Sequence, residues 1–222
     1  MAKTIGLIGG MSPQSSAEYY RIINEASKAR LGGRHNVRTL MLTLDFGEIE
    51  SMQHRGEWAA LEAGGADCVV LCTNTMHKVA AAIESAVAIP LLHIADATGA
   101  AIRAAAHTRV GLLGTRFTME QDFYRQRLEQ RHSLEVLVPD GEARNTVHRI
   151  IYDELCQGRV LDESRLGYRR IIAELGARGA QAVILGCTEI VMLIGPRDSS
   201  LPVFDTTSLH ACAAVEWALH NA

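Results

Sequence analysis

Two halves of this 222-residue chain carry the same ordered set of short patterns. IGLIGG at 5–10 resembles VGLLGT at 110–115, CVVLCTNT at 68–75 resembles AVILGCTE at 182–189, and IPLLHIAD at 89–96 resembles LPVFDTTS at 201–208. The offsets are 105 (5 to 110), 115 (72 to 187) and 112 (90 to 202). An order kept through three matches predicts two similar domains, related by an approximate two-fold axis, with a cleft between them.

Apolar runs alternate with segments of helical periodicity along both halves. The predicted strands are 3–8, 39–46, 68–71, 89–94, 110–115, 134–138, 182–186 and 202–204. The predicted helices are 13–31, 57–63, 76–86, 95–106, 119–130, 145–157, 162–178 and 209–220. Ser12 and Pro13 form a helix start, and Gly32-Gly33 form a stop. This alternation predicts parallel sheets covered by helices, the α/β class.

Composition excludes several function classes. The net charge is −3 with both signs interspersed, so nucleic acid is a poor partner. No apolar run approaches the roughly 18–20 residues that cross a bilayer, and the first apolar run, 5–8, is too short for an export signal. We therefore expect no membrane association and a cytoplasmic protein. The five cysteines lack a CxxC pair, which argues against disulfides and a zinc site.

Two cysteines stand out because each follows a buried strand. Cys72 and Cys187 are placed at strand ends, where open α/β sheets bind ligands. A helix follows each one closely, and its N-terminal field is expected to lower the thiol pKa from about 8.5. Short hydrogen-bonding side chains surround them, namely Thr73, Asn74, Thr75 and Thr188, and Met11, Ser12 and Thr115 are expected at the same rim.

A thiolate and a thiol on opposite sides of one carbon atom supply what an epimerisation without a cofactor needs. One sulfur removes the α-proton and the other returns a proton to the opposite face. Thiol pKa values can be tuned close to the working pH, and hydrogen bonds aimed at the substrate carboxylate stabilise the carbanion. The residues therefore predict proton transfer at a carbon atom.

The motifs CTNT and GCTE, the opening GLIGGMS and the strand VGLLGT resemble the aspartate/glutamate racemase family of amino-acid racemases. The resemblance covers nearly the whole chain. It implies two flavodoxin-like domains, 1–106 with 207–222 and 107–206, in which the C-terminal helix packs on the first. It also implies a homodimer, no pyridoxal phosphate and an amino-acid substrate.

The same resemblance assigns roles to residues of this chain. Cys72 and Cys187 become the two acid/base residues. The substrate contacts it implies are Met11, Gln53, Thr73, Asn74, Thr75, Thr188 and Glu189.

Two departures from the family pattern concern the substrate. Members specific for acidic amino acids often carry an Arg in the loop after the second strand, but this loop has none before Arg55. They often carry a Lys in a helix of the second half, where this chain has Cys156. These departures weaken aspartate and glutamate as preferred substrates and leave room for neutral ones. The segment after Trp58 is also about ten residues shorter than its counterpart, from the offsets 105 and 115.

Other interpretations of the same residues remain open. The fold also suits an isomerase or decarboxylase of a small dicarboxylate or hydantoin, a binding protein for a small carboxylate, and a dithiol redox pair, which needs Cα atoms within about 7 Å. His77 is interpreted as an exposed or capping residue rather than a metal ligand, and His93 as a core residue. GLIGG lacks the GxGxxG spacing of a dinucleotide site.

Overall fold

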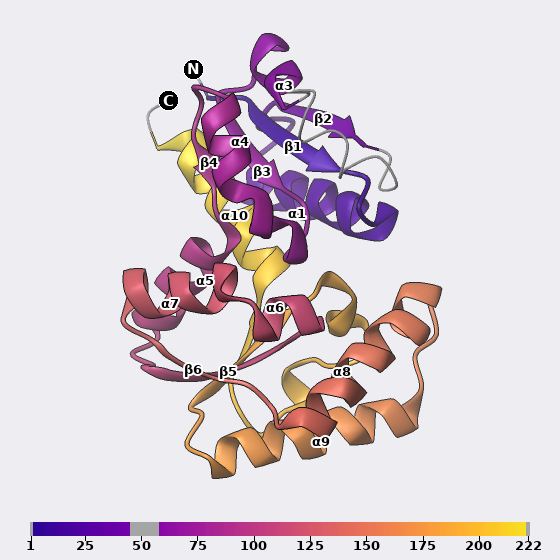
Figure 1. Ribbon diagram of the computed structural model, residues 1–222. Coiled ribbons are helices and arrows are strands. Elements are labelled where there is room, and N and C mark those ends of the chain that lie inside the picture. Colours follow the sequence, from indigo (N-terminus) through magenta and orange to yellow (C-terminus); the bar gives the residue numbers. More distant parts are fainter. Residues whose placement is uncertain (1, 45–57, 221–222) are drawn as a thin grey trace. The chain divides into compact units, whose positions relative to one another are not determined.

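The structure is a computed structural model that describes residues 2–44 and 58–220. The chain divides into two compact units, Met1–Ile94 with Thr207–Ala222, and Ala95–Thr206 (Figure 1). The sequence-based domain limits, 1–106 with 207–222 and 107–206, stay a prediction about folding domains.

The first unit contains a four-stranded parallel sheet. Its strands are β1 (Ile5–Gly9), β2 (Thr39–Thr43), β3 (Cys68–Leu71) and β4 (Leu91–Leu92), in the order β2-β1-β3-β4. Its helices are α1 (Pro13–Leu31), α3 (Ala59–Ala63), the 3-10 helix η2 (Thr75–Val79), α4 (Ala80–Ala86) and most of α10 (Thr206–Leu219). Every residue of β1 and β3 is buried, as continuous apolar runs in a parallel sheet should be.

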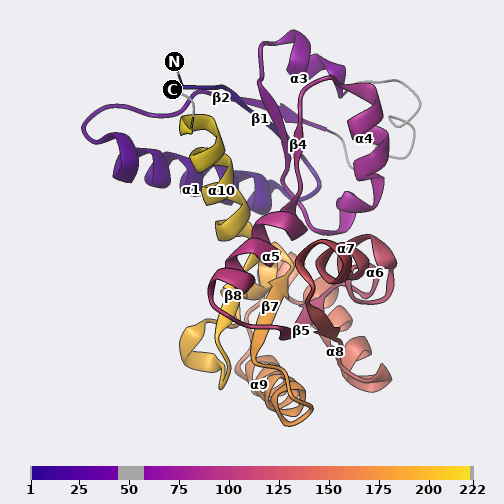
Figure 2. The ribbon, with the colours of Figure 1, turned by 90° about the vertical axis from the view of Figure 1, so that its left-hand side faces the viewer.

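Alternate residues of these strands pack on opposite faces of the sheet. Leu7 and Val70 contact the core beneath α1 and α10, whereas Ile8 and Val69 contact the core beneath α3 and α4. Figure 2 shows these two helix pairs on opposite sides of the sheet. Four α10 residues, Ala211, Ala214, Val215 and Ala218, lie in the core beneath α1 and α10.

The second unit repeats the arrangement. Its strands are β5 (Arg109–Gly114), β6 (Glu135–Leu137), β7 (Ala182–Gly186) and β8 (Val203–Asp205), in the order β6-β5-β7-β8. Its helices are α5 (Ile94–Ala104), α6 (Arg116–Glu120), α7 (Asp122–His132), α8 (Gly141–Asp153), α9 (Asp162–Ala177) and the 3-10 helices η3 (Leu155–Gln157), η4 (Thr188–Met192) and η5 (Pro196–Asp198).

In both sheets the strands lie side by side in the order second, first, third, fourth, as in flavodoxin-like folds. All six strand pairings are parallel. In the internal repeat β1 corresponds to β5, and β3 corresponds to β7. The predicted α/β class with two similar parallel-sheet domains is confirmed.

Local sequence signals set the ends of the helices. Ser12 caps α1 by accepting a hydrogen bond from the Ser15 N–H, and Gly32 ends it at φ 70°. The helix predicted at 145–157 starts earlier, because the Asp140 side chain accepts from the Ala143 N–H. Within the described residues, the structure has no helix long and apolar enough to cross a membrane.

Candidate functional site

The turn after β3, residues 72–75, is called the Cys72 turn. Leu71 pairs with Ile8 at the end of β1, and the next N–H, that of Cys72, donates to the Ile8 carbonyl over 2.9 Å. The Cys72 carbonyl accepts a hydrogen bond of 2.7 Å from the Ser15 hydroxyl on α1. Hydrogen bonds from β1 and α1 therefore fix the cysteine backbone at the carboxyl end of β3, where the sequence predicts it.

The Cys72 side chain is fully buried beneath α1 and α10. Its sulfur lies 4.0 Å from the Val70 carbonyl oxygen, a distance that gives only a weak hydrogen bond. Burial raises the pKa of the Cys72 thiol far above its usual range. The thiol is therefore protonated at neutral pH.

The backbone after Cys72 is tightly turned. The Thr73 N–H donates to the Leu71 carbonyl over 2.8 Å, and its carbonyl accepts from Nδ1 of His77 over 2.7 Å. Asn74 is 3% exposed, and Thr75 begins η2. The three predicted contact residues of this turn thus lie together at one strand end, directly beside Cys72.

The turn after β1 lies at the same edge of this sheet. Gly10 has a φ of 99°, and a Cβ built there would overlap the Leu44 carbonyl oxygen, so the position favours glycine. Met11 and Ser12 follow, at the start of α1. Gln53 lies outside the described residues.

The turn after β7, residues 187–189, is called the Cys187 turn. Gly186 pairs with Gly114 at the end of β5, and Cys187 follows in an extended conformation. The Cys187 sulfur donates a hydrogen bond of 2.9 Å to Oε2 of Glu189, which is 8% exposed. Thr188 begins η4. At the corresponding edge of β5, Thr115 caps α6 by accepting from the Thr118 N–H.

Burial raises the pKa of the Cys187 thiol well above its usual value, and the charge of Glu189 raises it further. The same two effects raise the pKa of Cys156, on η3, to about 11. Burial raises the pKa of Tyr152, and its neighbours Cys187, Cys156 and Glu189 raise it further by smaller amounts. A carboxylate, two thiols and a phenol thus interact electrostatically within the second unit.

These directions correct the sequence-based prediction that helix dipoles lower both thiol pKa values. Cys72 is followed by η2, which runs directly into α4, and Cys187 is followed by the five-residue η4. Burial of the sulfur is the largest effect on the pKa of each thiol. Desolvation therefore dominates, and it favours the neutral thiol at both positions.

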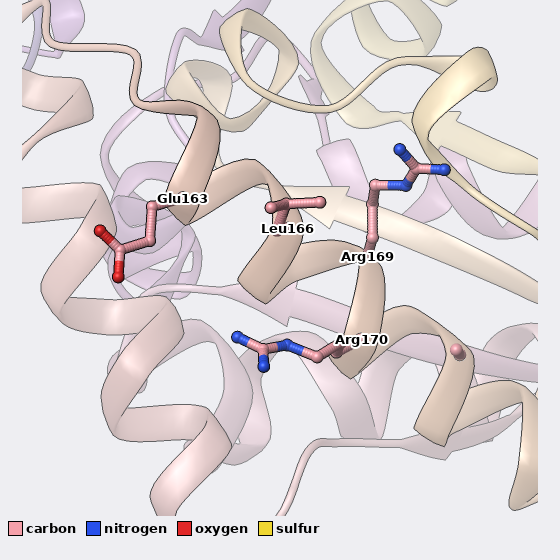
Figure 3. A pocket seen from close by; sticks show the side chains of 5 residues that line it. Glu163, Leu166, Arg169 and Arg170 are labelled. Carbon is pink, nitrogen blue, oxygen red and sulfur yellow. The ribbon is translucent and has the colours of Figure 1, made fainter.

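A surface hollow on α9 lies on one helix only. It is lined by Glu163, Leu166, Arg169, Arg170 and Ala173 (Figure 3). Leu166 is 58% exposed, and the opposite side of the helix supplies Tyr168 and Ile172 to the core. None of the five lining residues was predicted as a site residue. The hollow is the solvent side of a covering helix.

Sequence reasoning missed the residues that hold the two turns. Ser15 is 57 positions from Cys72, and its one available signal was a hydroxyl in the first turn of a helix. His77 was interpreted as an exposed or capping side chain, but it is 1% exposed and hydrogen-bonded at both ring nitrogens. Glu189, predicted as a substrate contact, instead accepts a hydrogen bond from the Cys187 thiol.

Comparison with known proteins gives one family. The family described as Asp/Glu/Hydantoin racemase matches residues 8–214. The broad specificity amino-acid racemase RacX of Bacillus subtilis (strain 168) is 23% identical over 95% of this chain and 96% of its own length. A crystal structure of a proposed Asp/Glu racemase from Yersinia pestis is 50% identical, with a TM-score of 0.91 over 98% of this chain and 99% of that one. An aspartate racemase homologue from Pyrococcus horikoshii OT3 is 33% identical, with a TM-score of 0.85 over 97% and 99%.

Proposed function

This chain belongs to the Asp/Glu/hydantoin racemase family, and from that premise we propose that it interconverts the L and D forms of an amino acid without pyridoxal phosphate. In this proposal Cys72 and Cys187 are the two residues that move the α-proton. One observation carries it: two units of the same strand order each hold a cysteine directly after their third strand.

The proton transfers balance with two thiols and no other reagent. A thiolate takes the α-proton, so that the C–H bond breaks, an S–H bond forms, and the electron pair stays on the α-carbon and its carboxylate. The second thiol then gives its proton to the opposite face, so that its S–H bond breaks and a new C–H bond forms. The product is the other enantiomer, and the thiolate and thiol have exchanged places. The reverse reaction starts from that state.

Glu189 gives Cys187 a means of losing its proton. The thiol donates to the carboxylate over 2.9 Å, and transfer along this bond leaves a thiolate beside a neutral carboxylic acid. Burial favours the neutral thiol at both positions, so the assignment rests on the carboxylate beside Cys187. We therefore assign Cys187 as the base and Cys72 as the acid of the first turnover from the resting enzyme.

The polar residues of both turns are proposed to bind the groups that every amino acid shares. Thr73, Asn74, Thr75 and Thr188 offer hydroxyl and amide groups to the α-carboxylate and the ammonium group, with Met11 and Gln53 as further contacts. Donors aimed at the carboxylate stabilise the charge that develops there when the α-proton leaves. In this proposal these groups do not contact the substrate side chain.

The substrate proposed is an amino acid whose side chain need not be acidic. Cys156 stands close enough to Glu189 for that carboxylate to raise its pKa. A second carboxylate, from aspartate or glutamate, would meet the negative charge of Glu189 if it approached this region. We therefore expect neutral amino acids such as homoserine, methionine and alanine to compete with aspartate and glutamate.

Proton NMR in D2O tests this function directly. L-aspartate, glutamate, homoserine, methionine, alanine and lysine are each incubated with enzyme, and the loss of the α-proton signal is followed together with the appearance of the D-form. Cys72→Ser and Cys187→Ser are compared with wild type. Cys212→Ser is the matched control, because Cys212 is exposed on α10.

Loss of racemisation in both site variants, with Cys212→Ser unchanged, is the expected result. If the enzyme instead released carbon dioxide from an achiral acid, or isomerised it, and only one of the two cysteines were required, the chain would be a decarboxylase or an isomerase. Tight binding of a small acid without any exchange, surviving both substitutions, would make the chain a binding protein.

The proposal also includes a homodimer and a cytoplasmic location, as the sequence suggests. Sedimentation equilibrium at several concentrations measures the first. Fractionation of cells that express the tagged chain measures the second. A monomer, or recovery outside the cytoplasmic fraction, would remove the corresponding part of the proposal without affecting the chemistry.

A further inference from the structure

Three histidines are buried together in the first unit. His77 on η2, His93 between β4 and α5, and His210 on α10 are 1%, 4% and 0% exposed. The ring centroids of His77 and His93 are 4.4 Å apart, and those of His77 and His210 are 5.7 Å apart. A buried imidazole is stable when its nitrogens are hydrogen-bonded, so their partners indicate what the rings do.

The partners of His77 define its tautomer. The Ile94 N–H donates to Nε2 over 3.2 Å, so Nε2 must carry the lone pair. Nδ1 therefore carries the proton, and it donates to the Thr73 carbonyl over 2.7 Å. A neutral ring protonated at Nδ1 satisfies both partners. In the opposite tautomer the Nε2–H would face the Ile94 N–H, and the lone pair of Nδ1 would face the Thr73 carbonyl oxygen.

The partners of His210 select the opposite tautomer. Nε2 lies 2.7 Å from the Leu92 carbonyl, which can only accept, so Nε2 carries the proton. Nδ1 then accepts from the Tyr19 hydroxyl over 2.8 Å. This ring joins α1, α10 and the last residue of β4. Leu92 and Ile94, on either side of His93, are thus each held by a histidine.

From these contacts we propose that His77 is a positioning residue for Cys72. Its ring joins the Thr73 carbonyl, one residue after Cys72, to the Ile94 N–H at the start of α5. Ser15 holds the carbonyl of Cys72 itself. Two consecutive peptide carbonyls are therefore fixed by buried side chains, and the inference rests on the proposed role of Cys72. His210 in turn donates to the Leu92 carbonyl at the end of β4, two residues before the Ile94 N–H that donates to His77.

Nδ1 of His77 donates to Thr73, and Nε2 accepts from Ile94. Two variants each retain one of these hydrogen bonds. His77→Asn puts an amide N–H near the position of Nδ1 and retains the donor to Thr73. His77→Gln puts an amide oxygen near the position of Nε2 and retains the acceptor for Ile94. Because the Thr73 carbonyl lies beside Cys72, the Asn variant should rescue the function and the Gln variant should not.

The expected kinetic result is a split between these variants. His77→Gln lowers kcat for α-proton exchange about tenfold with KM changed less than threefold, while His77→Asn stays within threefold of wild type. Melting temperatures are measured for both. Equal losses of kcat and equal losses of melting temperature in the two variants would make His77 a structural residue only and overturn the proposal.

Two further measurements do not need catalysis. Alkylation of Cys72 by iodoacetamide, followed by peptide mass mapping, should be about tenfold faster in His77→Gln than in wild type and His77→Asn, with Cys187 unchanged. Long-range ¹H–¹⁵N spectra of the wild type should show His77 protonated at Nδ1 and His210 at Nε2. A His77 ring protonated at Nε2 at neutral pH would overturn the inference, even if both variants failed to fold. If the wild type catalyses no exchange, the proposed function fails, and these two results still decide whether His77 holds the turn.

Discussion

Replacement of Glu189 by glutamine separates two effects of that carboxylate on Cys187. The side chain keeps its size and can still accept a hydrogen bond through its amide oxygen, but it loses the negative charge and can no longer take a proton. The carboxylate is 8% exposed and receives the thiol hydrogen over 2.9 Å, so solvent replaces little of what is lost. The proposed mechanism then loses the acceptor through which Cys187 becomes a base.

The size of the effect follows from the kind of bond that is changed. A hydrogen bond to a charged group contributes about 1.5–3 kcal/mol, and about 1.4 kcal/mol corresponds to a factor of ten. We therefore expect kcat/KM of Glu189→Gln to fall by roughly 10- to 150-fold. The loss should be the same for the L and D substrates, because the equilibrium constant of a racemisation is one and the ratio of the two kcat/KM values must equal it.

Thiol reactivity should move in the opposite direction. The charge of Glu189 raises the pKa of Cys187, so its removal lowers that pKa and increases the thiolate fraction at neutral pH. Iodoacetamide should alkylate Cys187 faster in the variant at pH 7–8, while the rate at Cys72 stays as in wild type. Slower exchange with faster alkylation is the expected pair of results. Faster exchange in the variant would refute the reasoning, because the carboxylate would then only oppose the thiolate.

Two further predictions concern stability. Burial raises the pKa of Asp96, but hydrogen bonding and the charge of Arg127 hold that pKa below its usual value. The ionised Asp96 therefore contributes its full stabilisation above the unfolded pKa of about 3.9. This contribution is lost as the pH falls through the lower folded-state pKa. Asp96→Asn should cost about 1 kcal/mol at pH 7 and flatten the decline of melting temperature below pH 4, measured by calorimetry; an unchanged acid decline would contradict this. Gly10→Ala should lower the melting temperature by about 4–12 °C, from about 2–3 kcal/mol of strain and overlap with Leu44. Gly158→Ala, in the left-handed helical region at φ 72° and ψ 13° with no heavy atom within 4 Å, is the control and should cost about 1 kcal/mol.

The fold was predictable because its signals are local and occur twice. The apolar runs at 68–71 and 182–186 are the third strands of their sheets, and Ser12 and Gly32 begin and end α1 as their residue types indicate. The repeat predicts two similar domains, and the two sheets have the same strand order. The family resemblance predicted from the same motifs is confirmed by the match over residues 8–214.

The chemistry of the site was less predictable because it depends on contacts between distant positions. Ser15 reaches the Cys72 carbonyl from 57 positions away, and the tautomer of His77 is set by an N–H 17 positions along the chain. The error over the thiol pKa values had a different origin. Sequence pattern indicates that a helical segment follows each cysteine, but it does not measure burial of the sulfur, which is the largest effect on both pKa values.

The two cysteine turns share a topology but differ in the chemistry around the sulfur. Cys187 donates to a carboxylate, whereas Cys72 is buried with a carbonyl oxygen 4.0 Å from its sulfur and a backbone held by Ser15 and His77. An internal repeat explains the shared position after the third strand, and it does not require the partners to match. Under the proposed mechanism this difference cannot favour one enantiomer at equilibrium. It sets which sulfur is the base in the resting enzyme, and hence from which face the α-proton first leaves.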